Sequence, residues 1–200
     1  MRKFNRLPSP EILIGNWERW GNKYAVNKRR NRGHQLSWKK NGQNIHPILK
    51  GTLSLQTDGH CSYCDHFPMK KSDQTIDHFK PKGVEIFYHL AYHWDNLYYS
   101  CADCQLAKGD DFDEALLRPD TEDFSFERYF KVNFSNGEIE INPNASEIDR
   151  NRAEVTIRIL GLNSDGQPIS RKHSLERYEG MFLKGEQIDI DDFSFRFMFD

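Results

Sequence analysis

Long apolar runs are scarce in this sequence. No run comes near the roughly 18 apolar residues that a membrane-spanning helix needs, and the opening stretch, MRKFNRLPSP, lacks the apolar core of a secretory signal. Hydrophobic residues make up only 37% of the 200 positions. We therefore expect a cytosolic protein with a small hydrophobic core, which a metal or a partner would help to stabilise.

Glycine-rich phosphate loops are also missing. Neither G-x-x-x-x-G-K-S/T nor G-x-G-x-x-G occurs, so the chain is not expected to hydrolyse ATP by itself. No segment repeats at a period of about 20 to 50 residues, which excludes a solenoid or a propeller. The expected organisation is one compact unit with appended segments.

Positive charge is concentrated in the first quarter of the chain. Residues 1–50 hold 12 Lys and Arg against two acids, a net charge of +10, so the remainder carries -12. The most basic stretch, NKRRNRGHQLSWKK at 27–40, interleaves aromatic rings with cations, which is typical of a phosphate-binding surface. A solvated basic linker is the alternative. The candidate phosphate ligands in this stretch are Arg29, Arg30 and Arg32.

The four cysteines form two Cys-x-x-Cys pairs with 36 residues between them. In a reducing compartment such pairs indicate a metal site more than disulfides. Each pair can present two thiolates to one tetrahedral ion, and four thiolates leave no open position for water, so the ion would be structural zinc. A buried thiol or a redox site is the alternative for either pair alone. The predicted zinc ligands are Cys61, Cys64, Cys101 and Cys104.

Capping residues and apolar spacing predict the regular elements. The expected helices run from Pro10 through Trp20, from Pro47 toward Gln56, over 102–108, from Glu147 to Gly161 and around 170–184. The expected strands lie at 74–79 and 97–101, on both sides of the Asn136-Gly137 turn, and at 193–199. The middle of the chain therefore reads as strand, long loop, strand, helix.

Chemically active residues gather between the two cysteine pairs. TIDHFKPK at 75–82 predicts a short strand that ends in Asp77 and His78, which would hold a carboxylate and an imidazole at its tip. The lysines that could contact phosphate are Lys80, Lys82 and, one helical turn after the last cysteine, Lys108.

The order of these parts resembles that of HNH endonucleases with the ββα-metal fold, in their zinc-bearing subtype. The motifs, Cys-x-x-Cys, Asp-His, Asn-Leu, Cys-x-x-Cys and a downstream lysine, cover residues 61–110. A closer similarity, to the PtuB subunits of Septu and related retron-associated anti-phage systems, extends over about residues 55–165 and rests on IDHFKPK, HWDNLYYSCADCQLAKGD, LLRPD and EVTIRILGLN. The resemblance implies an α+β protein with a ββα-metal, treble-clef-like core flanked by helices and a small hairpin.

The resemblance also implies roles for single residues. His78 would be the general base that takes a proton from water, to which a neutral imidazole is suited near pH 7. Asp77 would bind a catalytic Mg²⁺ or Mn²⁺ ion at the scissile phosphate. Asn96 would brace the loop between the strands and fix the angle of His78. The alternatives are a capping aspartate, an incidental histidine and a turn asparagine.

Gln105 departs from the family pattern. The family places His or Asn directly after the last cysteine as a second metal ligand, whereas Gln keeps the amide oxygen and adds a methylene. Because a hard cation accepts an amide oxygen, Gln105 is expected to bind the catalytic metal together with Asp77.

The predicted function is metal-dependent hydrolysis of phosphodiester bonds in DNA or RNA. No sequence-reading module is visible, so the target would be set by a partner, which the resemblance implies to be a PtuA-type ATPase, with retron components in some systems. The expected parts are a basic helical N-terminal region (1–56), a zinc-bearing HNH core (57–120) and a hairpin-and-helix C-terminal part packed on that core (121–200). A zinc-knuckle nucleic-acid-binding or scaffold protein with a degenerate nuclease site is the alternative.

Overall fold

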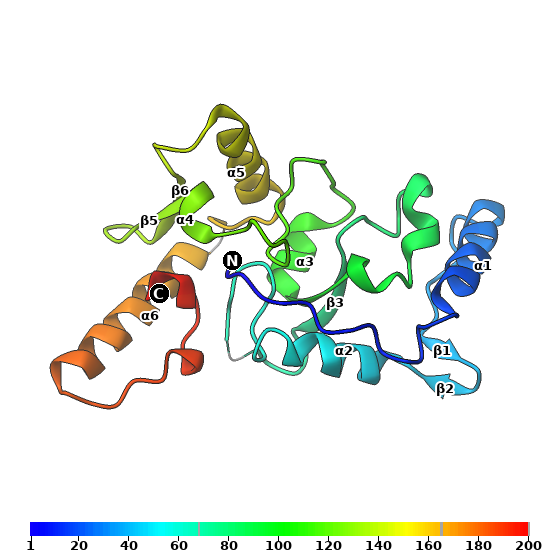
Figure 1. The fold of residues 1–200 in the computed structure, drawn as a ribbon, viewed down its shortest axis with the longest axis horizontal. Helices are drawn as coiled ribbons and strands as arrows, with labels where there is room; N and C mark the ends of the chain where they lie inside the picture. Colours follow the sequence, from blue (N-terminus) through cyan, green and yellow to red (C-terminus); the bar gives the residue numbers. More distant parts are fainter. Residues whose placement is uncertain (68, 165, 200) are drawn as a thin grey trace.

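The computed structural model describes residues 1–67, 69–164 and 166–199. Its elements, with η marking a short 3-10 helix, are α1 (Trp17–Arg30), β1 (Lys39–Lys40), β2 (Gln43–Asn44), α2 (His46–Leu55), β3 (Gln74–His78), η1 (Glu85–Leu90), η2 (Trp94–Asn96), β4 (Leu97–Cys101), α3 (Ala102–Lys108), α4 (Phe126–Tyr129), β5 (Phe130–Asn133), β6 (Glu138–Ile141), α5 (Glu147–Ile159), α6 (Gln167–Leu183), η3 (Ile190–Asp192) and η4 (Arg196–Met198). Figure 1 shows α1 and the β1–β2 hairpin at one end of an elongated molecule, α5 and α6 at the other, and β3 and α3 between them. The fold is α+β, as predicted.

The centre of the molecule is the predicted ββα unit. β3 and β4 pair antiparallel, with Gln74 opposite Cys101 and His78 opposite Leu97. α3 follows β4 without a loop, and the Cys101 sulfur caps it by accepting a hydrogen bond from the Cys104 amide. The tip of β3 therefore lies beside the start of β4, and α3 packs against both strands.

α1 packs on η1 and the residues that follow it through an aromatic stripe. Trp20 and Tyr24 are four residues apart and so lie on one helical face. Trp20 meets Tyr92 edge-on with 5.9 Å between ring centroids, and Tyr24 meets Tyr88 in the same way at 5.9 Å. Gly21 permits the close approach, because a Cβ there would lie 2.0 Å from a carbonyl oxygen of η1.

The first helix begins later than the sequence predicts. Pro10 opens a series of turns, such as the Leu13 amide bonding to the Pro10 carbonyl at 2.9 Å, and the helix starts only at Trp17. The interruption falls at Gly15, whose φ of 70° is left-handed and cannot continue a right-handed helix. The predicted helix is therefore wrong over residues 10–16 and confirmed from Trp17 to Trp20.

Most other predicted elements are confirmed. α2, α3, α5 and α6 occur within a few residues of their predicted ranges, and the side chain of Ser146 caps α5 by accepting from the Asp149 amide. The hairpin of β5 and β6 also forms, with Phe130 opposite Ile141. Its connection spans residues 134–137 and ends at Gly137, which has a φ of 80°.

The predicted strand at 193–199 is wrong. Phe193, Phe195 and Phe197 alternate and are all buried, which gives the period of a strand. The chain instead forms η4, because the backbone there binds Asp65: the Phe195 amide bonds to the Asp65 carbonyl at 2.8 Å and the Arg196 amide to its carboxylate at 2.6 Å. These amides are unavailable to a partner strand.

A buried ion pair joins this C-terminal segment to the loop that carries the first cysteine pair. The Arg196 guanidinium lies 2.8 Å from Asp65, and their side chains are 4% and 3% exposed. Arg196 also pairs with the more exposed Asp58 and Asp191 at 3.1 and 2.7 Å. These contacts hold residues 193–199 against Asp65, the residue that follows Cys64.

One hydrophobic cluster of the described residues contains side chains from all three predicted parts of the chain, for example Leu13, Tyr98 and Phe197. The division at residues 56 and 120 stays a prediction. No helix in the described ranges has the length and apolar character to cross a membrane.

Candidate functional site

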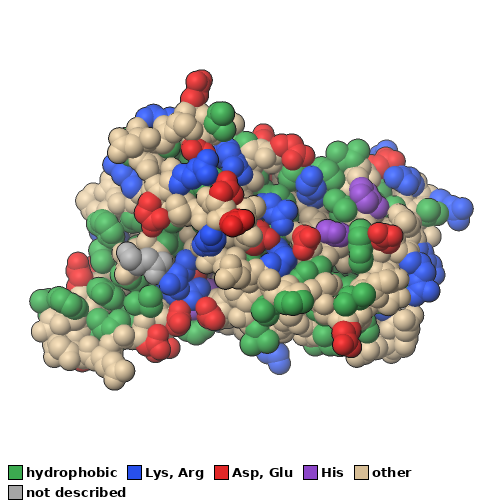
Figure 2. All heavy atoms as spheres, in the orientation of Figure 1, with side chains coloured by type: hydrophobic (Ala, Val, Ile, Leu, Met, Phe, Trp, Pro, Cys, Tyr) green, Lys and Arg blue, Asp and Glu red, His purple; other side chains and the backbone are tan. Residues whose placement is uncertain are grey.

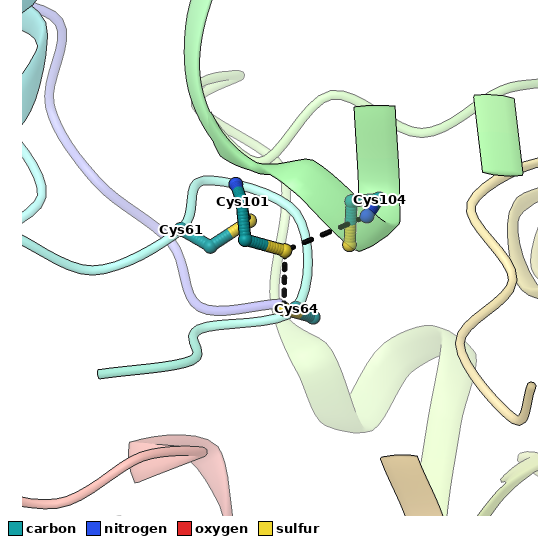
Figure 3. A group of neighbouring side chains, drawn as sticks. All are labelled: Cys61, Cys64, Cys101 and Cys104. Carbon is teal, nitrogen blue, oxygen red and sulfur yellow. Dashed lines mark hydrogen bonds between the residues drawn. The ribbon is translucent and has the colours of Figure 1, made fainter. Parts of the chain in front are cut away.

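The four cysteines come together in a buried cluster. Their sulfur atoms all lie within 4.8 Å of one another, and none of these cysteines is in a disulfide. Cys61 and Cys64 lie in the loop before β3, whereas Cys101 and Cys104 lie at the junction of β4 and α3 (Figure 3). The two Cys-x-x-Cys pairs therefore form one site, as predicted from the sequence.

The geometry of the cluster suits zinc. Four sulfurs at about 2.3 Å from a tetrahedral ion stand roughly 3.8 Å apart, and the Cys64 and Cys101 sulfurs are separated by 3.7 Å. The Cys101 amide also points at the Cys61 sulfur, at 3.3 Å, and so favours its thiolate. Four buried thiol ligands fit a structural zinc ion and leave it no open position for water.

His78 lies at the end of β3 and is 2% exposed. Its Nε2 is 2.9 Å from the Ala91 carbonyl oxygen. Because a carbonyl can only accept, this contact assigns the ring proton to Nε2 and leaves a lone pair on Nδ1. Nδ1 is buried and has no hydrogen-bond partner among the described residues. Burial, helped by the charge of Lys82, lowers the pKa of His78 to about 3, so the ring is neutral at pH 7.

A cavity of about 310 Å³ opens beside His78. Gln74, Ile76 and His78 line it together because alternate residues of β3 face the same side. Gln105 reaches it from α3, with its amide nitrogen donating to the Ile76 carbonyl at 3.2 Å. Lys82 also lines the cavity. We call it the His78 cavity.

Trp38 and His46 complete the His78 cavity from the N-terminal part of the chain. The indole of Trp38 stacks on the His78 ring with 6.1 Å between centroids and 24° between planes. Sequence reasoning placed Trp38 in a phosphate-binding stretch and missed its place beside the imidazole. No local signal identifies it, because the contact joins residues 40 positions apart.

Asp77 faces different partners from His78. It does not line the His78 cavity, and its carboxylate accepts from the Tyr63 hydroxyl at 2.8 Å and lies 3.3 Å from the Lys108 ammonium. Burial raises the pKa of Asp77, against the lowering effects of Lys108 and Tyr63. The structure therefore brings Gln105, and not Asp77, to the cavity beside His78.

Lys108 is buried within this arrangement. Its side chain is fully covered, and its ammonium donates to the His78 carbonyl at 2.7 Å as well as pairing with Asp77. Lys108 therefore holds the backbone of His78 at the end of β3. Its ammonium is covered and does not lie at a surface open to phosphate. Tyr63, between the first two cysteines, was missed as the second partner of Asp77.

Asn96 ties together the two ends of the loop between the strands. Its side-chain oxygen accepts from the Lys80 amide at 2.7 Å, and its nitrogen donates to the carbonyls of Lys80 and Leu90 at 3.0 and 3.2 Å. These contacts hold the chain that leaves His78. The part that Asn96 plays in catalysis stays a prediction.

The remaining predicted phosphate ligands lie outside the His78 cavity. Lys80 is half-buried, pairs with Glu114 at 3.6 Å and lies over the ring of Phe112. Arg29 pairs with Glu85 at 3.1 Å near the end of α1. Arg30 ends α1, Arg32 follows in the next loop, and both are exposed. The structure brings none of these four side chains to His78.

Comparison with known proteins agrees with the geometry. Residues 61–111, which include all four cysteines, β3, β4 and α3, match the family model described as HNH endonuclease. No curated protein matches the chain. The matched segment begins at the first zinc-binding cysteine and ends just after Lys108, so it coincides with the ββα unit and its metal cluster. The chain thus carries an HNH endonuclease domain at residues 61–111, and this domain implies nuclease activity.

Proposed function

We propose that the protein hydrolyses phosphodiester bonds at the His78 cavity, with His78 as the general base. The observation that carries the proposal is the free lone pair of Nδ1 in a neutral imidazole, held by the Nε2 bond to the Ala91 carbonyl. A base needs such a lone pair to take a proton from water. Proton uptake places a positive charge on His78, which a bound phosphate anion in the cavity stabilises.

Two side chains in the His78 cavity support binding of a phosphate. Lys82 supplies positive charge, and Gln105 supplies an amide. HNH endonucleases typically use a divalent metal ion, which stabilises negative charge on the leaving oxygen. Of the two predicted ligands, only Gln105 faces the cavity, because Asp77 is held by Tyr63 and Lys108. The donor set for Mg²⁺ or Mn²⁺ is therefore incomplete in this arrangement.

The biological setting that we propose is anti-phage defence. The support is the sequence similarity to PtuB subunits over about residues 55–165. In this setting a PtuA-type ATPase, with retron components in some systems, would control cleavage and supply the target. The absence of a phosphate-binding glycine loop in this chain agrees with ATP hydrolysis by a separate subunit.

The test is nicking of plasmid DNA, and cleavage of single-stranded RNA in parallel, with Mg²⁺ or Mn²⁺ and with partner present. His78→Ala should lower the rate by roughly 10²- to 10⁴-fold, because it removes general-base catalysis, while zinc content and melting temperature stay the same. His173→Ala, an exposed histidine on α6, is the matched control. Undiminished cutting by His78→Ala excludes His78 as the base.

A second function is favoured by the engaged state of Asp77 and by the Gln105 bond to the Ile76 carbonyl. The Asp77 carboxylate is already engaged by Tyr63 and Lys108, and Gln105 is tied to the strand through its amide nitrogen. A zinc-knuckle scaffold that binds nucleic acid without cutting it needs no catalytic metal ligands. Binding that is unaffected by His78→Ala, with no cleavage by the native protein under any metal, supports this second function.

A further inference from the structure

A second cavity, of about 320 Å³, lies between α1 and the segment that leads into β1. Trp20, Lys23 and Tyr24 line it from α1. Trp20 and Tyr24 also pack against Tyr92 and Tyr88, whereas Lys23 is exposed. Lys40 of β1 lines the other side, together with Tyr92. We call it the Lys23–Lys40 cavity. Its walls are firmly built, because Trp20 and Tyr92 are both buried and in edge-on contact.

The Lys23–Lys40 cavity carries unbalanced positive charge. Lys23, Lys39 and Lys40 line it, whereas no Asp or Glu is found among its described lining residues. The Lys40 ammonium lies 4.2 Å from the centroid of Tyr92 and 5.6 Å from that of Trp20. Burial and then the charge of Lys23 lower the pKa of Lys40. An anion between the lysines would relieve this repulsion.

One chain segment separates this cavity from the His78 cavity. Leu36 and Trp38 line the His78 cavity, whereas Ser37 and Lys39 line the Lys23–Lys40 cavity. Trp38 also meets Tyr92 edge-on at 5.7 Å between ring centroids. The two cavities thus lie on opposite sides of a thin layer of backbone and aromatic rings.

We propose that the Lys23–Lys40 cavity binds a backbone phosphate of the nucleic acid whose scissile phosphate occupies the His78 cavity. This inference rests on the proposed function. Lysine binds phosphate as a point charge, and phosphate contacts position a nucleic acid without reading its sequence. The site would therefore set the path of the strand through the enzyme, not the choice of bases.

The sequence predicts Arg29, Arg30 and Arg32 as phosphate ligands, whereas the cavity is lined by lysines. Figure 2 shows Lys and Arg side chains at the end of the molecule where Figure 1 places α1. Of the predicted arginines, Arg29 already pairs with Glu85. Lys23 and Lys40 have no ion-pair partner within the part of the chain that the structure describes. Arg30 and Arg32 likewise have no ion pair among the described residues, but neither of them lines this cavity. Lys23 and Lys40 therefore offer a phosphate unpaired positive charge at the walls of the cavity.

The test measures binding of a short fluorescein-labelled single-stranded oligodeoxynucleotide, without added Mg²⁺ so that cleavage does not intervene. Lys23→Gln/Lys40→Gln should weaken binding and lower the slope of log affinity against log salt by about 0.7, the value for one phosphate on a single strand. Lys172→Gln/Lys184→Gln, two exposed lysines at the α6 end, is the control and should keep the native slope. Melting temperatures verify that the cavity variant is folded.

Acetylation of the native protein, read by mass spectrometry, locates the contact without a mutation. The oligonucleotide should protect Lys23 and Lys40, and inorganic phosphate at the same phosphate concentration should not. Protection by inorganic phosphate alone overturns the nucleic-acid assignment in favour of a free-phosphate site. If the native protein cleaves nucleic acid but Lys23→Gln/Lys40→Gln keeps the native salt dependence of binding, this inference is overturned and the proposed function stands. A native protein that neither binds nor cleaves removes the proposed function as well.

Discussion

Replacement of Arg196 by Met should cost about 3 kcal/mol of unfolding free energy. Breaking a buried ion pair costs about 3–5 kcal/mol, because the remaining charge is left without compensation. Both side chains of the Arg196–Asp65 pair are under 5% exposed. We expect the lower end of this energy range, because the backbone amide of residue 196, 2.6 Å from the Asp65 carboxylate, can still donate to it after the substitution.

The measurement is urea unfolding of the zinc-loaded protein, followed by circular dichroism. For a chain of this size, a loss of about 3 kcal/mol corresponds to a fall in melting temperature of roughly 6–12 °C. Arg128→Met is the matched control, because the Arg128–Asp149 pair has similar distances but an arginine side chain that is 41% exposed. Solvent screens such a surface pair, so its loss should cost much less stability than the loss of the buried pair.

A double variant separates charge from packing. Asp65→Asn/Arg196→Met removes both charges and should be more stable than Arg196→Met alone, because no uncompensated carboxylate remains. The reasoning is refuted if Arg196→Met loses no more unfolding free energy than the Arg128→Met control. The reasoning is also refuted if Asp65→Asn/Arg196→Met is less stable than Arg196→Met alone.

Three further predictions concern the zinc cluster, Gln105 and acid stability. Cys101→Ser should lose zinc and unfold the ββα unit; a zinc-free variant with the native melting temperature contradicts this. Gln105→Ala should raise the Mg²⁺ concentration needed for half-maximal cleavage, and Gln105→Asn should not, because it keeps the amide oxygen; coincident titration curves for Gln105→Ala and the native protein would leave Gln105 as a helix residue. Although burial raises it, hydrogen bonds and charge from Arg118 and Arg6 lower the pKa of Asp120 below its ordinary value. Asp120 therefore stabilises the fold above about pH 4, the unfolded value, and this contribution is lost as pH falls further. Unfolding of Asp120→Asn should depend less on pH in that range, and an unchanged dependence would contradict the ionised state of Asp120.

Local parts of the site could be predicted from the sequence, because their determinants are close in the chain. The Cys-x-x-Cys spacing fixes each half of the zinc cluster, and the strand that ends at His78 pairs with the strand that ends at Cys101. The insert between the cysteine pairs therefore has few ways to fold once the ion is bound. The HNH match over residues 61–111 covers this same locally determined part.

The contacts around that unit could not be predicted, because they join distant segments. Trp38 stacks on His78 from a segment 40 residues earlier, and α1 approaches η1 closely only because Gly21 has no Cβ. The segment 193–199 has the alternation of a strand, yet its amides bind Asp65. Periodicity reports which side chains are buried, but not whether the backbone finds another strand or a carboxylate.

The short helix α3 couples metal occupancy to the chemistry of the imidazole. Its first turn is held by two zinc ligands, Cys101 and Cys104, and its last residue, Lys108, grips the His78 carbonyl. A helix of seven residues is too short to persist alone in water. Withdrawal of zinc would therefore release the backbone of His78 without any direct contact between the ion and the ring. The zinc supply of the cell would therefore control cleavage through α3, although zinc itself takes no part in the reaction.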